Sequence, residues 1–199
     1  MNLNQQLINA IKKNNLKNVK YLVEKGANIH ANNDRALINA AFYGHLNIVK
    51  YLIEKGANIH AYDYALINAA SNGYLETVKY LVEKGANIRA NNDRALINAV
   101  YGGYLETVKY LIEKGANIHT NNDEALINAA SNGHLDGHLD IVKYLIEKGA
   151  HLTEKMDIPV ELQEQVLINN PSSIIFINNL IPELKIKYSA YLELDDIGL

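Results

Sequence analysis

Cysteine and tryptophan are absent from this chain, and proline occurs only 3 times in 199 residues. Without cysteine the protein has no disulfide, no thiolate nucleophile and no cysteine-ligated zinc. No segment approaches the roughly 18 consecutive apolar residues that a membrane-spanning helix needs. The opening residues, MNLNQQLINAIKKNN, also lack the apolar segment of a secretory signal. We therefore expect an intracellular protein, in the cytoplasm, with no membrane partner.

An excess of basic residues is missing as well. Lysine and arginine number 19 against 22 acidic residues, which gives a net charge of −3. A protein that neutralises the phosphates of a nucleic acid needs a basic surface. We therefore expect no nucleic-acid partner. The chain is 48% hydrophobic, which is enough apolar material for an ordered core.

What the sequence has in abundance is repetition. The string GAN recurs with its glycine at Gly26, Gly56, Gly85 and Gly115, and the variant GAH begins at Gly149. Successive glycines are separated by 30, 29, 30 and 34 residues. Each glycine closes one copy of a unit, so residues 1–152 hold five copies, at about 3–34, 35–63, 64–93, 94–123 and 124–152.

Each copy has the pattern of two short helices. In the second copy, apolar residues three and four apart predict one helix near 36–43 and another near 47–54, on either side of Gly44-His45. Gly56 stands where the end of a helix needs a left-handed residue. A helix hairpin of this size cannot bury its own apolar face, but stacked hairpins can. The sequence therefore predicts an all-α solenoid.

The first helix, the Gly-His break, the second helix and the closing Gly-Ala together resemble the ankyrin repeat. This resemblance implies a non-catalytic scaffold that binds another protein on a concave groove. Two features depart from the family. Arg35–Ala41 reads R-A-L-I-N-A-A where the family has T-P-L-H-x-A-A, so the threonine and histidine hydrogen bonds are missing. The copies are also three or four residues shorter than the 33-residue norm, which implies shortened fingers between Ala31 and Leu37.

The repeat units are similar in style to the ankyrin proteins of giant DNA viruses of amoebae. The bias toward asparagine, isoleucine, lysine and tyrosine agrees with an AT-rich genome. This likeness implies a viral protein that acts inside a host cell.

Positions that are identical in all copies indicate scaffold. We expect the tyrosine of each KYL to pack within the stack, with a binding stripe as the alternative; these are Tyr21, Tyr51, Tyr80, Tyr110 and Tyr144. We expect the asparagine of each INA to bond to the backbone of a neighbouring finger, with a solvated polar position as the alternative; these are Asn9, Asn39, Asn68, Asn98 and Asn128.

Positions that differ between copies lie in the finger and directly after INA, and in ankyrin proteins such positions face the groove. Aromatic and arginine side chains are enriched at interface hot spots. The expected partner-binding residues, mostly in copies two to four, are Arg35, Phe42, Tyr43, Tyr62, Tyr64, Arg94 and Tyr101. The alternative is that some of these tyrosines only pack sideways on the next repeat.

The 7 histidines raise the question of a metal site, because His134 and His138 stand four residues apart. The segment GHLDGHLD is a tandem duplication, however, and it explains both this spacing and the step of 34 residues. We therefore expect no metal and no cofactor. The duplication either starts the second helix of the fifth copy one turn earlier or bulges the loop before it. The sequence contains neither a Ser-His-Asp order nor a phosphate-binding glycine loop, so no motif in it indicates an enzyme.

From about Thr153 the repeat stops, and residues 153–199 carry helix signals of their own. Since a solenoid needs its last apolar face covered, we predict a helical cap on a monomer. The alternative rests on 158–162, Ile-Pro-Val-Glu-Leu, which is similar to the L-P-x-E-L opening of an F-box. That likeness implies an adaptor that recruits a host ubiquitin ligase.

Overall fold

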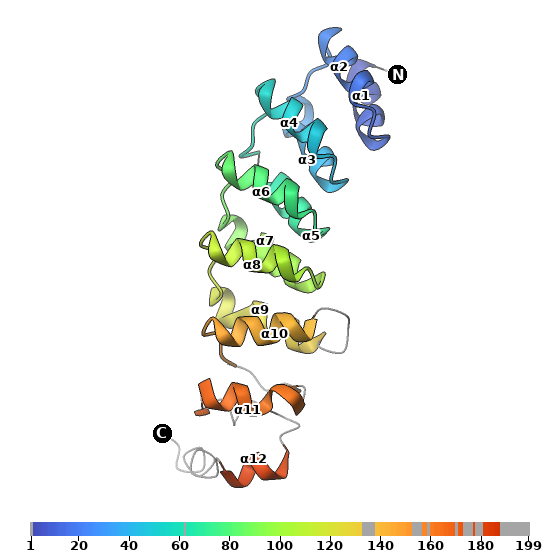
Figure 1. Ribbon diagram of the computed structural model, residues 1–199. Coiled ribbons are helices and arrows are strands. Elements are labelled where there is room, and N and C mark those ends of the chain that lie inside the picture. Colours follow the sequence, from blue (N-terminus) through green and yellow to red (C-terminus); the bar gives the residue numbers. More distant parts are fainter. Residues whose placement is uncertain are drawn as a thin grey trace.

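The helices of the computed structural model follow one another in a single stack (Figure 1). The structure describes residues 2–61, 63–132, 138–152, 157–158, 160–169, 171–172, 177 and 181–187. The first helices of the five pairs are α1 (Leu3–Lys12), α3 (Ala31–Phe42), α5 (Tyr64–Ser71), α7 (Ala90–Tyr101) and α9 (Thr120–Ser131). The second helices are α2 (Leu16–Glu24), α4 (Leu46–Glu54), α6 (Leu75–Glu83), α8 (Leu105–Glu113) and α10 (His138–Glu147). Two further helices follow, α11 (Val160–Asn169) and α12 (Pro182–Lys187).

The all-α class predicted from the sequence is confirmed, and the described residues include no β-strand. Helix α4 begins one residue before the predicted start and ends at the predicted residue. Among the helices of the described part of the chain, none has the length and apolar character that a membrane span requires.

The two rows of helices pack differently. Each first helix lies against the first helix of the next pair along much of its length, whereas neighbouring second helices touch much less. Small side chains at the first-helix interfaces allow this close approach. They belong to four completely buried alanines, Ala40, Ala69, Ala99 and Ala129. The first-helix row is therefore the inner, concave side of the stack, and the second-helix row is the outer, convex side (Figure 1).

One leucine from each helix of a pair fills the space between the rows. On the first helices these are Leu37, Leu66, Leu96 and Leu126, and on the second helices Leu52, Leu81, Leu111 and Leu145. All of them are at most 1% exposed. Because each contributes to a cluster that continues from pair to pair, the core runs the length of the stack.

Short left-handed turns replace the fingers, as the missing residues predict. Asn32, Asn33 and Asp34 have φ angles of 53°, 56° and 55°. The same geometry recurs at 91–93 and at 121–123. Asparagine and aspartate are the non-glycine residues that adopt this conformation most readily. The repeated Asn-Asn-Asp thus encodes the turn directly.

The break between the helices of a pair needs glycine for two reasons. Gly44 has a φ of +68°, and a Cβ there would lie 2.6 Å from the ring of Tyr74 in the next pair. Gly73 has a φ of +69°, and a Cβ there would lie 2.4 Å from the ring of Tyr104. The glycine therefore makes the turn and also admits the aromatic ring of the following repeat.

Helix α10 begins at His138, one residue before the leucine at which the other second helices begin. Both predictions for the tandem duplication, an extra turn before this helix or a bulged loop, fall on residues 133–137. These residues, including His134, lie outside the described residues. His138 is 3% exposed, and its Nε2 lies 3.0 Å from the carbonyl oxygen of Tyr101.

Helix α11 packs on α10 at the end of the repeats. Its apolar residues Leu162, Val166 and Leu167 belong to the continuous core. Gln163 is completely buried: its Nε2 donates to the carbonyl of Ile158 at 3.0 Å, and its Oε1 accepts from the backbone N–H of Ile181 at 3.0 Å. One amide side chain thus ties α11 to the segments on both sides of it.

We predict that Leu52→Ala costs about 2–5 kcal/mol of unfolding free energy, because Leu52 is 0% exposed and its loss leaves a cavity between pairs. Tyr101→Ala is the control, since this side chain is 68% exposed and should change stability by no more than about 0.5 kcal/mol. Urea unfolding monitored by circular dichroism measures both values. Equal destabilisation by the two substitutions would contradict the division between core and surface.

Candidate partner-binding groove

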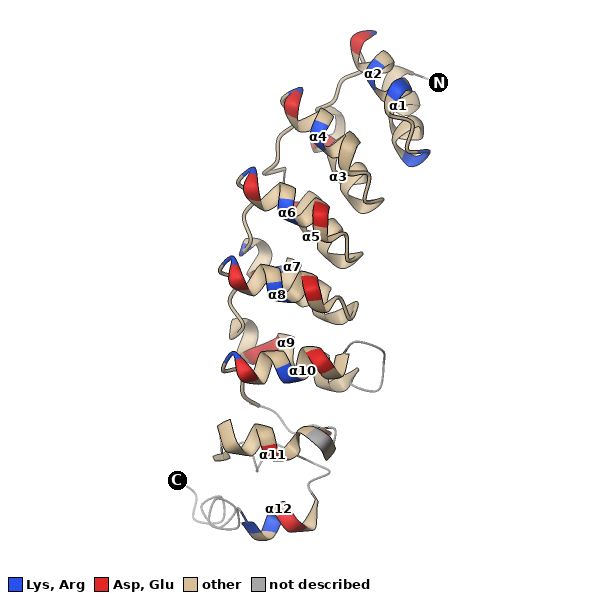
Figure 2. Cartoon of the chain, viewed as in Figure 1, with Lys and Arg blue, Asp and Glu red and all other residues tan. Residues whose placement is uncertain are grey.

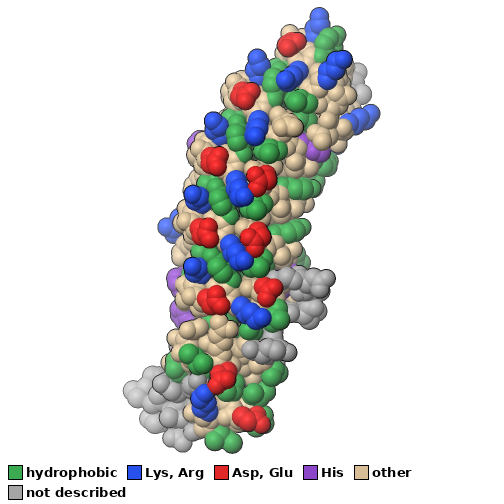
Figure 3. Space-filling view, in the orientation of Figure 1, with side chains coloured by type: hydrophobic (Ala, Val, Ile, Leu, Met, Phe, Trp, Pro, Cys, Tyr) green, Lys and Arg blue, Asp and Glu red, His purple; other side chains and the backbone are tan. Residues whose placement is uncertain are grey.

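Charged side chains are concentrated on the second helices of the convex row, and the first helices of the concave row carry fewer of them. Figure 2 shows lysines and acidic residues at the same places on α4, α6, α8 and α10. In space-filling view these side chains form a column that follows the second helices (Figure 3). Helix α5, by contrast, contains no charged residue, and α1 contains only Lys12.

The central lysine of each described second helix has a local partner. Lys79 Nζ lies 2.8 Å from Glu76 Oε1, and this hydrogen bond raises the pKa of the lysine. Lys109 pairs with Glu106 in the same way at 2.9 Å. The first two second helices lack this acidic residue, and there the lysine lies over the KYL tyrosine of the next pair. Lys50 Nζ, for example, is 5.4 Å from the ring centre of Tyr80.

The KYL tyrosines belong to the scaffold, as expected. Tyr51 is 8% exposed, and Tyr80, Tyr110 and Tyr144 pack against the core. Burial raises the pKa of all four hydroxyls. Tyr21, in the first described helix pair, is 55% exposed, so the expected packing does not hold for this tyrosine.

The INA asparagines were expected to hold the finger backbone, but hydrogen bonds to an aspartate hold it instead. Asp34 Oδ1 accepts from the backbone N–H of Asn58 at 2.8 Å, and Asp93 Oδ1 accepts from that of Asn117 at 2.8 Å. Asp63 makes the same bond to Asn87 at 3.1 Å. Each aspartate thus ties the start of a first helix to the turn that follows the second helix of the same pair. We call this series the aspartate ladder.

The INA amides have other surroundings. Asn98 Nδ2 donates to Ser71 Oγ at 2.8 Å, which joins α7 to α5. Asn39 and Asn68 line a groove on the concave row. The expectation about the finger backbone was therefore wrong for these residues, because the carboxylates of the Asn-Asn-Asp turns lie closer to it.

This groove crosses the first helices of the first three pairs and has a volume of about 660 Å³. Four of the seven expected partner-binding residues line it, namely Arg35, Phe42, Tyr43 and Tyr64. Helix α1 contributes Gln5, Ile8 and Lys12, and the remaining lining residues are Asn32, Ile38, Asn39 and Asn68. The groove lies on pairs one to three rather than on copies two to four.

Two exposed aromatic rings line the groove, Phe42 at the end of α3 and Tyr64 at the start of α5. Phe42 is 44% exposed and Tyr64 is 47% exposed. The rings of Phe42 and Tyr43 meet edge to face, with centres 5.0 Å apart, and Tyr43 also stacks on His45 at 5.8 Å. Tyr43 therefore contacts two rings, while Phe42 contacts one of these rings and stays largely exposed.

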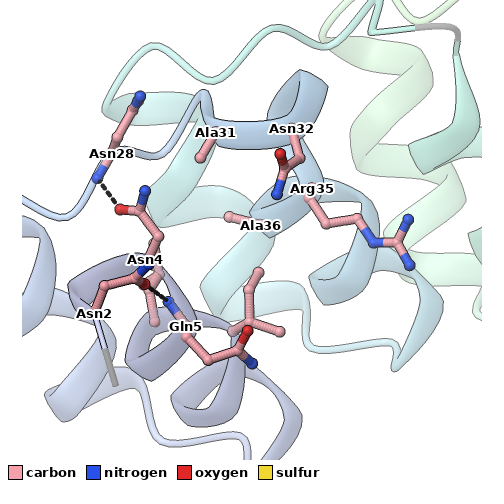
Figure 4. Close-up of a pocket in the computed structure, with 10 residues that line it drawn as sticks. Asn2, Asn4, Gln5, Asn28, Ala31, Asn32, Arg35 and Ala36 are labelled. Carbon is pink, nitrogen blue, oxygen red and sulfur yellow. Dashed lines mark hydrogen bonds between the residues drawn. The ribbon is translucent and has the colours of Figure 1, made fainter.

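A smaller pocket of about 250 Å³ adjoins the groove and shares Gln5, Ile8, Asn32 and Arg35 with it. Figure 4 shows the side chain of Asn4 turned toward the backbone N–H of Asn28, which donates to Asn4 Oδ1 at 2.8 Å. Arg35 extends away from this hydrogen bond (Figure 4). The concave surface is therefore continuous from the first finger to the aromatic rings.

The other expected residues do not join this groove. Arg94 and Tyr101 are exposed on α7, farther along the concave row. Tyr62 lies outside the described residues. Gln5, Ile8, Ile38, Asn39 and Asn68 line the groove but were not expected there. Comparison of the copies did not single them out, because Ile38, Asn39 and Asn68 are repeated between copies and so resemble scaffold residues.

Comparison with protein families agrees with this architecture. The family model described as ankyrin repeats (3 copies) matches residues 3–63 and 66–156. The chain belongs to the ankyrin-repeat family. No curated protein matches the chain significantly. Ankyrin repeats are protein–protein interaction modules, and the proteins that carry them are typically non-catalytic scaffolds.

We predict that Asp93→Ala lowers the unfolding free energy by about 1–3 kcal/mol, because Asn117 N–H and Thr120 Oγ1 lose a buried acceptor. Asp93→Asn keeps an acceptor oxygen and tolerates the φ of 51°, so it should cost less. Chemical unfolding of the two variants measures the difference. If Asp93→Ala is as stable as the unsubstituted protein, the aspartate ladder does not hold the repeats.

Proposed function

We propose that this ankyrin-repeat protein is a non-catalytic scaffold that binds a protein partner in the concave groove across α1, α3 and α5. The observation that carries the proposal is the meeting of Arg35, Phe42, Tyr43 and Tyr64 in one groove. These residues come from positions that differ between copies, and they are types that dominate binding energy at interfaces.

The chemistry of the groove defines the partner surface. Lys12 and Arg35 supply positive charge, and none of the described residues that line the groove is acidic. The aromatic rings offer apolar area, and the amides of Gln5 and Asn39 offer hydrogen bonds. A partner segment that carries an acidic side chain beside apolar ones complements this arrangement.

The scaffold supports binding by limiting the entropy lost on association. The groove residues stand on helices, and the aspartate ladder fixes how each first helix begins. A surface that is already ordered loses little freedom when the partner docks. Arg94 and Tyr101 lie on the same concave row and extend the contact for a longer partner.

For the C-terminal segment, burial favours a cap over a recruiter. Ile158 is 0% exposed and Leu162 is 1% exposed, so these two apolar residues of the F-box-like motif are already buried in the stack, whereas Val160 is 53% exposed. Pro159 lies outside the described residues. Copurification with a cullin adaptor subunit is the observation that would support the ubiquitin-ligase role instead. The viral origin, intracellular location and monomeric state stay predictions.

Affinity capture with the full chain, followed by mass spectrometry, supplies the partner, and calorimetry then tests the groove. We predict that Phe42→Ala and Tyr64→Ala each weaken binding by about 2 kcal/mol or more, which is about 30-fold in Kd. Both side chains are about half exposed, so melting curves should show that the variants fold.

The matched control is the double reversal Lys79→Glu with Glu76→Lys on the convex row. This pair is exposed, and exposed ion pairs contribute little, so binding should change only modestly. Loss of binding by the reversal, with full binding by the aromatic truncations, would place the partner on the convex side. Tyr101→Ala shows in addition whether the contact continues along α7.

A further inference from the structure

Two imidazoles and a carboxylate meet at Asp123, in the first turn of α9. His119 Nδ1 lies 2.9 Å from Asp123 Oδ1, and His151 Nδ1 lies 3.7 Å from Asp123 Oδ2. All three potential ligand atoms lie within 4.8 Å of one another. The two rings are tilted against each other with centres 5.7 Å apart.

The repeats explain how this arrangement arises. Every earlier Gly-Ala is followed by asparagine, as at Asn58, but in the fifth copy Gly149-Ala150 is followed by His151. The earlier aspartates therefore have one basic neighbour each in the described contacts. His30 lies beside Asp34 and Arg89 beside Asp93, whereas Asp123 has two imidazoles.

We propose that His119, Asp123 and His151 bind a divalent transition-metal ion such as Zn²⁺. Imidazole nitrogen and carboxylate oxygen are ligands that Zn²⁺ prefers, at about 2.0–2.2 Å. A tetrahedral ion at that distance separates its ligand atoms by about 3.3 Å. The two imidazoles approach different oxygens of the carboxylate, at 2.9 and 3.7 Å, so each is near the required separation from Asp123.

The three proposed ligands differ in burial in a way that suits a metal site. The Asp123 side chain is 3% exposed and fixed in its turn, while the side chains of His119 and His151 are 48% and 43% exposed. Small rotations of the two imidazoles can therefore complete the geometry. Solvent reaches the cluster and can supply the fourth ligand.

The bound ion has a structural role in this position. His119 precedes α9, Asp123 lies in its first turn, and His151 follows α10. The ion thus closes the fifth helix pair across the segment that contains the tandem duplication. An ion that binds only the folded chain stabilises that pair, and the stabilisation grows with the logarithm of the metal concentration above Kd.

Calorimetric titration of the metal-free full chain with ZnCl₂ tests the site, and thermal melting with Zn²⁺ or EDTA tests the coupling to stability. We expect one bound ion per chain and a higher melting temperature with Zn²⁺. Co²⁺ in place of Zn²⁺ should give the visible absorption of a four-coordinate ion.

Two variants remove one ligand each and use residues that the chain already has at equivalent places. His151→Asn restores the asparagine of the other copies, and His119→Arg copies Arg89. Loss of an outer-shell partner alone costs about 10–100-fold in affinity, so either variant should weaken Zn²⁺ binding at least about tenfold. His30→Asn is the control, because its aspartate has a single imidazole, and it should leave binding unchanged.

Absence of Zn²⁺ binding would show that the two imidazoles only pair with the carboxylate. Binding that survives both His151→Asn and His119→Arg would place the ion at other histidines. Melting curves without metal separate these outcomes from misfolding, because each variant should melt cooperatively like the unsubstituted chain.

Discussion

No helix pair in this protein can bury its own apolar face, and the rest of the structure depends on this constraint. Each pair covers its neighbour, so Leu52 and Leu81 complete one continuous core rather than separate ones. The alanines between the first helices bring that row closer together than the second-helix row. Curvature, and with it a concave surface, follows from the size of these side chains.

Different residues hold the stack together and bind the partner. Aspartates of the turns tie each pair closed, and lysines of the convex row pair with a glutamate or lie over a tyrosine. Since these contacts do not involve the exposed side chains of the first helices, those side chains can vary without loss of the fold. Phe42 and Tyr64 occupy such positions, and they border the groove. In the fifth pair, Asp123 lies beside two imidazoles, where we propose the metal ion.

Much of the fold could be predicted because periodicity reports burial directly: the five helix pairs, the short fingers and the packed tyrosines follow from it. The site was harder to predict. Arg35, Phe42, Tyr43 and Tyr64 were found because they vary, but Ile38 and Asn68 repeat and were read as scaffold. Asp93 was not predicted to matter, because its hydrogen bond to Asn117 spans 24 residues and depends on how the second helix returns. The contact between His119 and His151 depends on how the chain returns after the second helix, so the local spacing of the histidines does not predict it.

The central claim is that the partner contacts the first helices and leaves the convex row free. Chemical-shift changes of backbone amides during titration with the captured partner test this claim most directly. We predict changes concentrated in α1, α3 and α5, with little change in α4, α6 and α8. Changes concentrated in the second helices, with α3 and α5 unperturbed, would contradict the claim.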